Sequence, residues 1–264
     1  MEGHEPSPWL PVRRTAKRHV RKMDPSTGES GGSQPQVLQD EEAGTPWMTK
    51  AQNNPQGLRV LVNEYVAASL GQRLGAAVQP AAVLAVPAAV AADVHHEGGA
   101  AWQDGPSFAS QLMDSAAPYA ADMLAAASDR VSLAKVAVLD ALLGQNDGRQ
   151  ARGTRDGSHF DVRAVDFGHA LGNPQWSAVD LAARPVPTAI PDPNGWLGSV
   201  TPDELEEIAA AVASVSDAEI DELVESIPRE WGVTQEEQNA LAAYLKDRRS
   251  VMAVLVEALA GKAP

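Results

Sequence analysis

Two aspartates, Asp147 and Asp166, stand in positions where they could do chemistry, and each closes an apolar run within residues 139–171. The segment between them predicts a tight hairpin. Asp156-Gly157 readily takes the positive φ values of a two-residue loop, and residues 160–165 alternate apolar and polar side chains. A loop aspartate after a helix can act as a base, and an Asp-Phe-Gly aspartate after a strand can hold a metal ion. This order indicates a site for phosphoryl transfer.

Each aspartate also has an ordinary explanation, because an Asp after a helix is commonly a turn former. The phosphoryl-transfer hypothesis therefore requires a lysine and a helical glutamate upstream. Lys50 ends a predicted strand over residues 46–50, where an ammonium can pair with nucleotide phosphates if a carboxylate holds it. Glu64 lies in a predicted helix over residues 58–74, which Gly75 is expected to cap. A surface lysine and a solvated glutamate are the alternatives.

Residues 28–35, with the sequence GESGGSQP, are rich in glycine and precede the lysine strand. Successive backbone N–H groups in such a turn can face an anion, which is how loops hold phosphates. A flexible linker would have the same composition.

The composition limits the function classes. A chain of 264 residues can form one large domain or two lobes, and 44% hydrophobic with 21% charged residues is typical of a globular protein. The absence of cysteine excludes disulfides, thiolate metal sites and a cysteine nucleophile, and favours an intracellular, cytoplasmic protein. A net charge of −14 argues against general nucleic-acid binding. Pro80 and Pro87 interrupt the most apolar window, so we expect no membrane span.

The remaining stretches give a coarse order of elements. We expect a disordered tail over residues 1–11. The basic residues 12–22 favour a solvated strand edge, with a docking patch for a phosphate-rich or acidic partner as the alternative. Residues 81–91 predict a strand and crossover, residues 95–106 a loop, and residues 108–128 helix. Three capping boxes, beginning at Thr201, Ser216 and Thr234, predict three C-terminal helices.

Taken together, the segments GGSQP, WMTK, NPQGLRVLVNEYVAASLGQRLG, LDALLGQNDGRQAR and AVDFGHAL resemble the small HipA-like kinase domains of bacteria. The closing segment EWGVTQEEQNALAAYLKDRRSVM is similar to the final helices of that group, and the similarity covers roughly residues 12–259. It implies an α+β, two-lobed, protein-kinase-like fold. An N-lobe with an antiparallel sheet and one helix would cover residues 12–95, and a mostly helical C-lobe residues 96–264.

The resemblance also implies the nucleotide-binding residues, with ATP and Mg²⁺ as cofactors. Lys50 matches the lysine that binds the ATP phosphates, and Glu64 matches the helical glutamate that pairs with it. Gly31, Gly32 and Ser33 fall where the loop that covers the phosphates lies.

By the same resemblance, Asp147 matches the base that deprotonates a substrate hydroxyl, and Asp166 matches the aspartate that holds magnesium. One position departs from the pattern. Relatives usually place an Asn five residues after the base, and Arg152 stands there, which cannot ligate a cation. Arg149 and Arg152 would bring positive charge beside the phosphates. They could replace part of a metal's role, or they could mark a site that no longer turns over.

Two functions remain open at this point. One is a kinase that transfers the γ-phosphoryl group to a hydroxyl, most simply a Ser or Thr of a protein or peptide, although a small-molecule acceptor is also compatible. The other is a catalytically inactive kinase-like module that binds nucleotide or acts as a scaffold. A helical adaptor with coincidental motifs is a third, plainer alternative. The sequence does not identify the acceptor.

Overall fold

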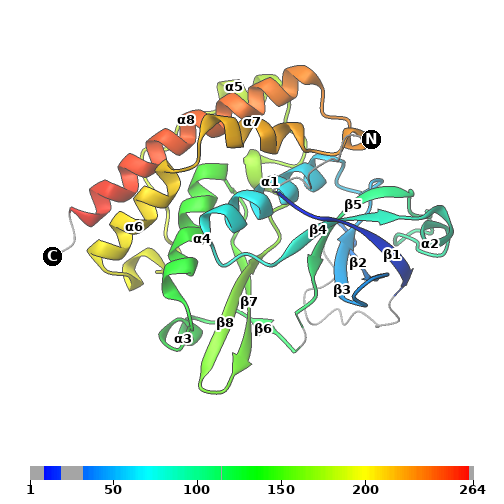
Figure 1. The fold of residues 1–264 in the computed structure, drawn as a ribbon, viewed down its shortest axis with the longest axis horizontal. Coiled ribbons are helices and arrows are strands. Elements are labelled where there is room, and N and C mark those ends of the chain that lie inside the picture. The colour runs from blue at the N-terminus through cyan, green and yellow to red at the C-terminus, as the bar shows by residue number, and fades with distance from the viewer. Residues whose placement is uncertain (1–8, 19–31, 114, 262–264) are drawn as a thin grey trace.

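The computed structural model describes residues 9–18, 32–113 and 115–261, which form two lobes (Figure 1). Within these residues the first lobe is a closed barrel with the strand order β1-β2-β3-β5-β4. Its strands are β1 (Val12–Arg18), β2 (Gln36–Asp40), β3 (Pro46–Lys50), β4 (Ala81–Val86) and β5 (Gly105–Gln111). β1 and β4 are parallel, and the other neighbouring strands are antiparallel. The short helix α2 (Ala88–Ala92) lies between β4 and β5 in the chain.

Helix α1 (Arg59–Leu74) lies between the barrel and the C-terminal helices (Figure 1). Nearly all of its residues are buried, because the helix is covered by both lobes and not by one alone. Gly75 ends it with a φ of +65°, as the sequence predicts. The second lobe also holds this helix at both ends. Arg59 pairs with Glu237 at 2.5 Å, and Arg73 with Glu219 at 2.6 Å.

The second lobe is mostly helical. Its helices are α3 (Ala121–Ala125), α4 (Arg130–Leu143), α5 (Ala178–Ala183), α6 (Pro202–Ala213), α7 (Asp217–Glu225) and α8 (Gln235–Ala260), with 3₁₀ turns η2 (Ala170–Gly172), η3 (Leu197–Ser199) and η4 (Arg229–Trp231). The three predicted capping boxes are confirmed, since Thr201, Ser216 and Thr234 begin α6, α7 and α8 with both reciprocal hydrogen bonds formed. Among the described residues, no helix combines the length and the apolar character needed to cross a bilayer.

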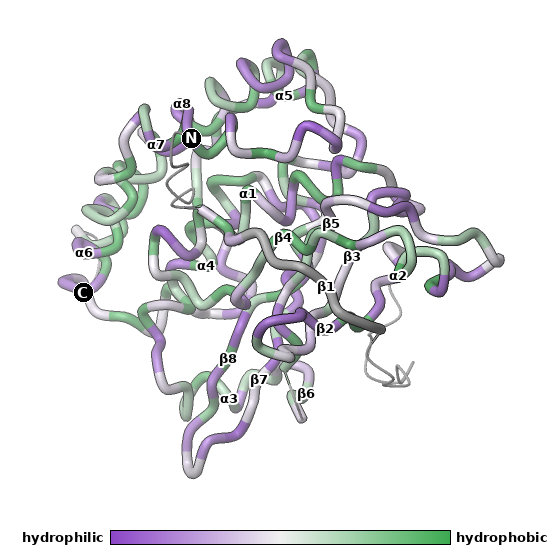
Figure 2. Tube along the Cα trace, turned by 45° about the vertical axis from the view of Figure 1, so that its right-hand side comes forward, coloured by the Kyte–Doolittle hydropathy of each residue, from purple (hydrophilic) through white to green (hydrophobic). Residues whose placement is uncertain are grey.

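A small sheet of β6 (Ala117–Pro118), β7 (Gln150–Asp156) and β8 (His159–Val165) carries the predicted hairpin. β7 and β8 pair from Gln150 opposite Val165 to Asp156 opposite His159, so residues 157 and 158 form the two-residue loop. The loop therefore begins one residue later than the predicted Asp156-Gly157 pair, because Asp156 still belongs to the ladder. Gly157 takes a φ of +59°, which such a loop requires. Figure 2 shows that the tip of this hairpin is hydrophilic, in keeping with its exposure. Asp166 follows the last residue of β8, so the hairpin positions it.

Several predictions about organisation are wrong. The stretch predicted as loop and then helix contains β5, which pairs with β3 and β4, so the first lobe runs to Gln111 and not to residue 95. β5 has mostly small side chains and lacks the β-branched residues typical of strands, so its sequence does not predict a strand; its pairing with β3 and β4 stabilises it. Trp9 and Leu10 are buried, so the expected disordered tail does not include them, and residues 1–8 lie outside the described residues. β1 is paired on both sides and is therefore not an edge strand.

Candidate active site

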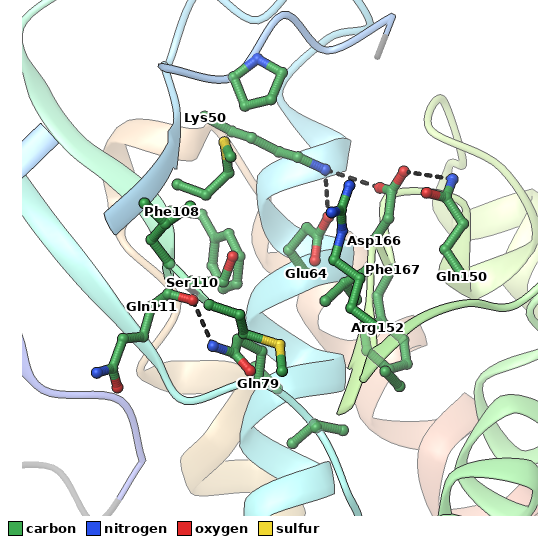
Figure 3. Close-up of a pocket in the computed structure, with 18 of the residues that line it drawn as sticks. Lys50, Glu64, Gln79, Phe108, Ser110, Gln111, Gln150, Arg152, Asp166 and Phe167 are labelled. Carbon is green, nitrogen blue, oxygen red and sulfur yellow. Dashed lines mark hydrogen bonds and ion pairs between the residues drawn. The ribbon is translucent and has the colours of Figure 1, made fainter. Parts of the chain in front are cut away.

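The structure brings together three of the predicted site residues: Lys50, Glu64 and Asp166. Lys50 ends β3, which pairs with β2 on one side and β5 on the other, and its side chain is buried. Its Nζ donates to Oε1 of Glu64 and to Oδ1 of Asp166, the latter at 2.9 Å (Figure 3). Strand, helix and the segment after β8 therefore meet at one ammonium group.

The charges of this triad support one another. Burial disfavours the charge of Lys50, but the carboxylates of Glu64 and Asp166 outweigh burial, and the pKa of Lys50 is raised. The Lys50 ammonium lowers the pKa of Asp166 to about 2, against the effect of burial. Burial raises the pKa of Glu64, while Lys50 opposes that shift. Lys50 and Asp166 are therefore charged throughout the neutral pH range.

Asp166 combines an accessible carboxylate with an unusual backbone. Its side chain is 37% exposed, and its Oδ2 accepts a hydrogen bond from Nε2 of Gln150 at 3.1 Å. Its φ is +60°, in the left-handed region that residues other than glycine rarely occupy. Strain of this kind costs of order 1–3 kcal/mol and is found mostly at functional sites. The left-handed backbone of Asp166 therefore directs its carboxylate into the pocket and lowers the stability of the fold.

A pocket between the two lobes contains the triad. Gln150, Arg152 and Phe167 line it from the second lobe. Residues 110–113, at the end of β5, line the pocket from the barrel side, away from Lys50. Gln79, which follows α1, donates from its Nε2 to the carbonyl of Gln111 on this side of the pocket (Figure 3). The pocket thus has one charged end and one end built largely from main chain and uncharged side chains.

The predicted phosphate-covering loop is only partly described. Ser33 is buried, lines the pocket, and its carbonyl accepts from Nδ2 of Asn54 at 3.1 Å. Gly32 is exposed and does not line the pocket. Gly31 lies outside the described residues. Asn54, between β3 and α1, thus ties the described end of this loop to the lysine strand.

Asp147 is not in contact with the triad. It follows Gly144, the left-handed cap of α4, and its exposed carboxylate accepts from the backbone N–H of Gly148 at 2.9 Å. It does not line the pocket itself, although Gln150, three residues further on, does. The structure therefore places Asp147 on the loop that leads into the pocket, with its side chain open to solvent.

The two arginines have different surroundings. Arg149 does not lie beside the pocket as we expected; its buried guanidinium pairs with Asp140 of α4 and contacts main-chain carbonyls. Its charge is neutralised there and is not available to a phosphate. Arg152 does line the pocket, and Figure 3 shows its side chain extending from β7 toward Glu64.

Asn63 is the main residue that the sequence reasoning missed. It is fully buried on α1, next to Glu64. Its Nδ2 donates to the carbonyls of Gly168 (2.7 Å) and Asn173 (3.2 Å), and its Oδ1 accepts from the indole of Trp176 at 2.7 Å. An amide directly after the apolar residues 60–62 of the predicted helix was the available signal. Asn63 ties the glutamate helix to the segment that follows Asp166.

Comparison with known proteins establishes the fold. Neither a scan against protein-family models nor a search of curated proteins gives a match. Among solved structures, the crystal structure of the Helicobacter pylori proinflammatory kinase CtkA is similar, with a TM-score of 0.57 and 14% identity over 95% of this chain and 100% of that chain. At this identity the likeness shows fold alone, and the predicted α+β, kinase-like fold is confirmed.

Proposed function

We propose that this protein is an ATP- and magnesium-dependent, HipA-like kinase that transfers the γ-phosphoryl group to a hydroxyl, most simply a Ser or Thr of a protein or peptide. The observation that carries the proposal is the contact of Lys50 with both Glu64 and Asp166, inside an interlobe pocket of a kinase-like fold. Phosphoryl transfer depends mainly on positioning and charge stabilisation, and this triad provides both.

Lys50 is the proposed ligand of the nucleotide phosphates. Its ammonium is charged and is held at the pocket by two carboxylates, so it needs little reorganisation to meet an anion. Glu64 fixes the direction of the lysine, because it is buried on a helix that both lobes hold. Ser33, which lines the pocket from the barrel side, would lie over the phosphates.

Asp166 is the residue that would hold magnesium. Its carboxylate is ionised, partly exposed and directed into the pocket, and magnesium is commonly bound by one or two carboxylates together with substrate phosphates. When bound, the ion would neutralise phosphate charge. The described part of the chain contains no group of three or more His, Cys, Asp or Glu side chains that could hold a metal ion. Arg152 offers no ligand for a second ion.

Asp147 is the proposed base. Its exposed position on the loop before β7 leaves it accessible to an acceptor hydroxyl arriving from solvent. The carboxylate would orient that hydroxyl and take its proton as the phosphoryl group is transferred.

A catalytically inactive, nucleotide-binding module is the second candidate. Arg152 favours it, because a cation stands in the pocket where the resemblance implies a metal-binding Asn. The position of Asp147 outside the pocket lining is also compatible with it.

Incubation with labelled ATP, magnesium and a panel of Ser/Thr peptides and small hydroxyl compounds tests the proposal. We expect transfer that Asp147→Asn and Asp166→Asn each abolish. Transfer that neither substitution affects would contradict the site assignment. A melting-temperature shift with ATP that does not need magnesium, together with no transfer, would favour the inactive module. Failure to bind any nucleotide would contradict both.

A further inference from the structure

Arg149 contacts the segment around Asp166, although it does not line the pocket. Its Nε and Nη2 bind both oxygens of Asp140, the Nε contact at 2.9 Å and the Nη2 contact at 2.5 Å. Its Nη1 donates to the carbonyls of Val165 (2.8 Å) and Asp166 (3.2 Å). Its guanidinium carbon lies 3.9 Å from the ring centroid of Phe167. One side chain therefore contacts three consecutive residues.

The two carbonyls that Arg149 binds are those of the peptide groups before and after the α-carbon of Asp166. The orientation of these two peptide planes defines φ and ψ of Asp166, the residue with a φ of +60°. A donor that binds both carbonyls at once favours this left-handed conformation over the extended one, in which the two carbonyls point in nearly opposite directions. The strained conformation is thus held by a specific contact.

Asp140 makes the guanidinium a rigid donor. It lies in the last turn of α4, and its bidentate pairing fixes the guanidinium plane. The side chain of Arg149 is 3% exposed, so solvent does not compete for these hydrogen bonds. Because Arg149 is two residues after Asp147, the same contact also fixes the loop of the proposed base relative to Asp166.

We propose that Asp140 and Arg149 form a positioning clamp that holds Asp166 in its metal-binding orientation and sets its place relative to Asp147. This inference rests on the proposed function. Neither residue lines the pocket; both act through the main chain of residues 165 and 166. A lysine could not replace Arg149, because a single ammonium cannot match the carboxylate bidentately, bind both carbonyls and stack on Phe167.

Three forms of the protein test the clamp. Arg149→Lys keeps the charge but loses the planar fork. The double variant Asp140→Leu/Arg149→Met removes both charges together, so it leaves no unpaired buried carboxylate and should lose less stability than removal of Arg149 alone. Arg163→Lys is the matched control, since Arg163 forms a half-exposed ion pair with Asp161 at 2.8 Å on the same hairpin.

The first measurement is ADP binding by calorimetry, with and without magnesium. Residues that orient metal ligands typically contribute about 10- to 100-fold in metal affinity or activity. We therefore expect both clamp variants to raise the magnesium concentration needed for half-maximal binding or transfer by about that factor, with ADP affinity in the absence of magnesium unchanged. Arg163→Lys should leave both quantities unchanged. Wild-type magnesium dependence in the folded double variant would overturn the proposal.

The second measurement is amide hydrogen exchange of residues 166–168, which needs neither nucleotide nor activity. Exchange should be faster in both clamp variants than in Arg163→Lys. Unchanged exchange in both clamp variants would overturn the clamp even if the protein is a kinase. Conversely, the clamp variants could exchange faster while the wild-type protein binds no nucleotide. That result would support the contact made by the clamp and contradict the proposed function.

Discussion

Replacing Asn63 by leucine tests how the glutamate helix is joined to the segment after Asp166. Leucine has a similar volume but no polar group, so the substitution leaves the indole N–H of Trp176 and the carbonyl of Gly168 without the partner that Asn63 supplies. Both residues are buried, and each buried group that loses its partner costs about 1–3 kcal/mol. The half-buried carbonyl of Asn173 adds less. We expect the free energy of unfolding to fall by about 3 kcal/mol.

The assay is urea unfolding followed by tryptophan fluorescence, with calorimetry as a second measurement. For a chain of this size, 1 kcal/mol corresponds to about 2–4 °C in melting temperature, so the melting temperature should fall by about 6–12 °C. Asn239→Ala is the matched control, because Asn239 is exposed on α8 and its Oδ1 accepts from Nε2 of Gln235, one turn earlier on the same helix, at 3.1 Å. It should change the unfolding free energy by less than about 0.5 kcal/mol.

An Asn63→Leu protein that unfolds within about 1 kcal/mol of the wild type would refute the reasoning, because the orphaned groups would then have found other partners. If Asn239→Ala also lowered the unfolding free energy by a large amount, the assay would be reporting a general weakening of helices and not the contacts of Asn63.

Three further predictions concern the pocket. Lys50→Met removes the cation that Glu64 and Asp166 share, so calorimetry should detect no ATP binding; wild-type affinity would contradict the role of Lys50. Since the pKa of Asp166 is lowered to about 2 on folding, its ionisation stabilises the protein above the unfolded pKa of about 3.9, and this stabilisation is lost as the pH falls toward 2. Asp166→Asn should therefore flatten the acid limb of the unfolding free energy measured from pH 5 to about 2, and an unchanged limb would count against the pairing. Arg152→Asn removes a cation and adds an amide oxygen, so nucleotide binding should become more steeply magnesium-dependent; a fall in transfer at every magnesium concentration would show that Arg152 contributes its charge.

Local sequence signals predicted the elements that carry the site. Gly75 marked the end of α1, the Asp156-Gly157 pair marked the β7–β8 hairpin, and the capping boxes marked the three C-terminal helices. Each signal concerns neighbours a few residues apart, where φ preferences and caps act directly. Boundaries that depend on distant partners were missed. β5 is a strand because β3 and β4 pair with it, and Trp9 is buried because the folded chain covers it.

Arg149 shows the same limit at the level of a side chain. Its sequence position, two residues after Asp147, suggested a charge for the phosphates. The structure gives it a carboxylate partner nine residues earlier and two carbonyls 16 and 17 residues later, which no local pattern encodes.

The sequence by itself determined which residues could serve phosphoryl transfer, because Lys50, Glu64, Asp147 and Asp166 each stand at the end of, or within, an element that local patterns define. Only the tertiary structure decided which of them meet. Lys50 and Asp166 are 116 residues apart, and their contact depends on how the barrel packs against α1 and the second lobe. Because Lys50 is buried, its charge depends on this contact: a charge removed from water is stable only beside an opposite charge, which the fold supplies.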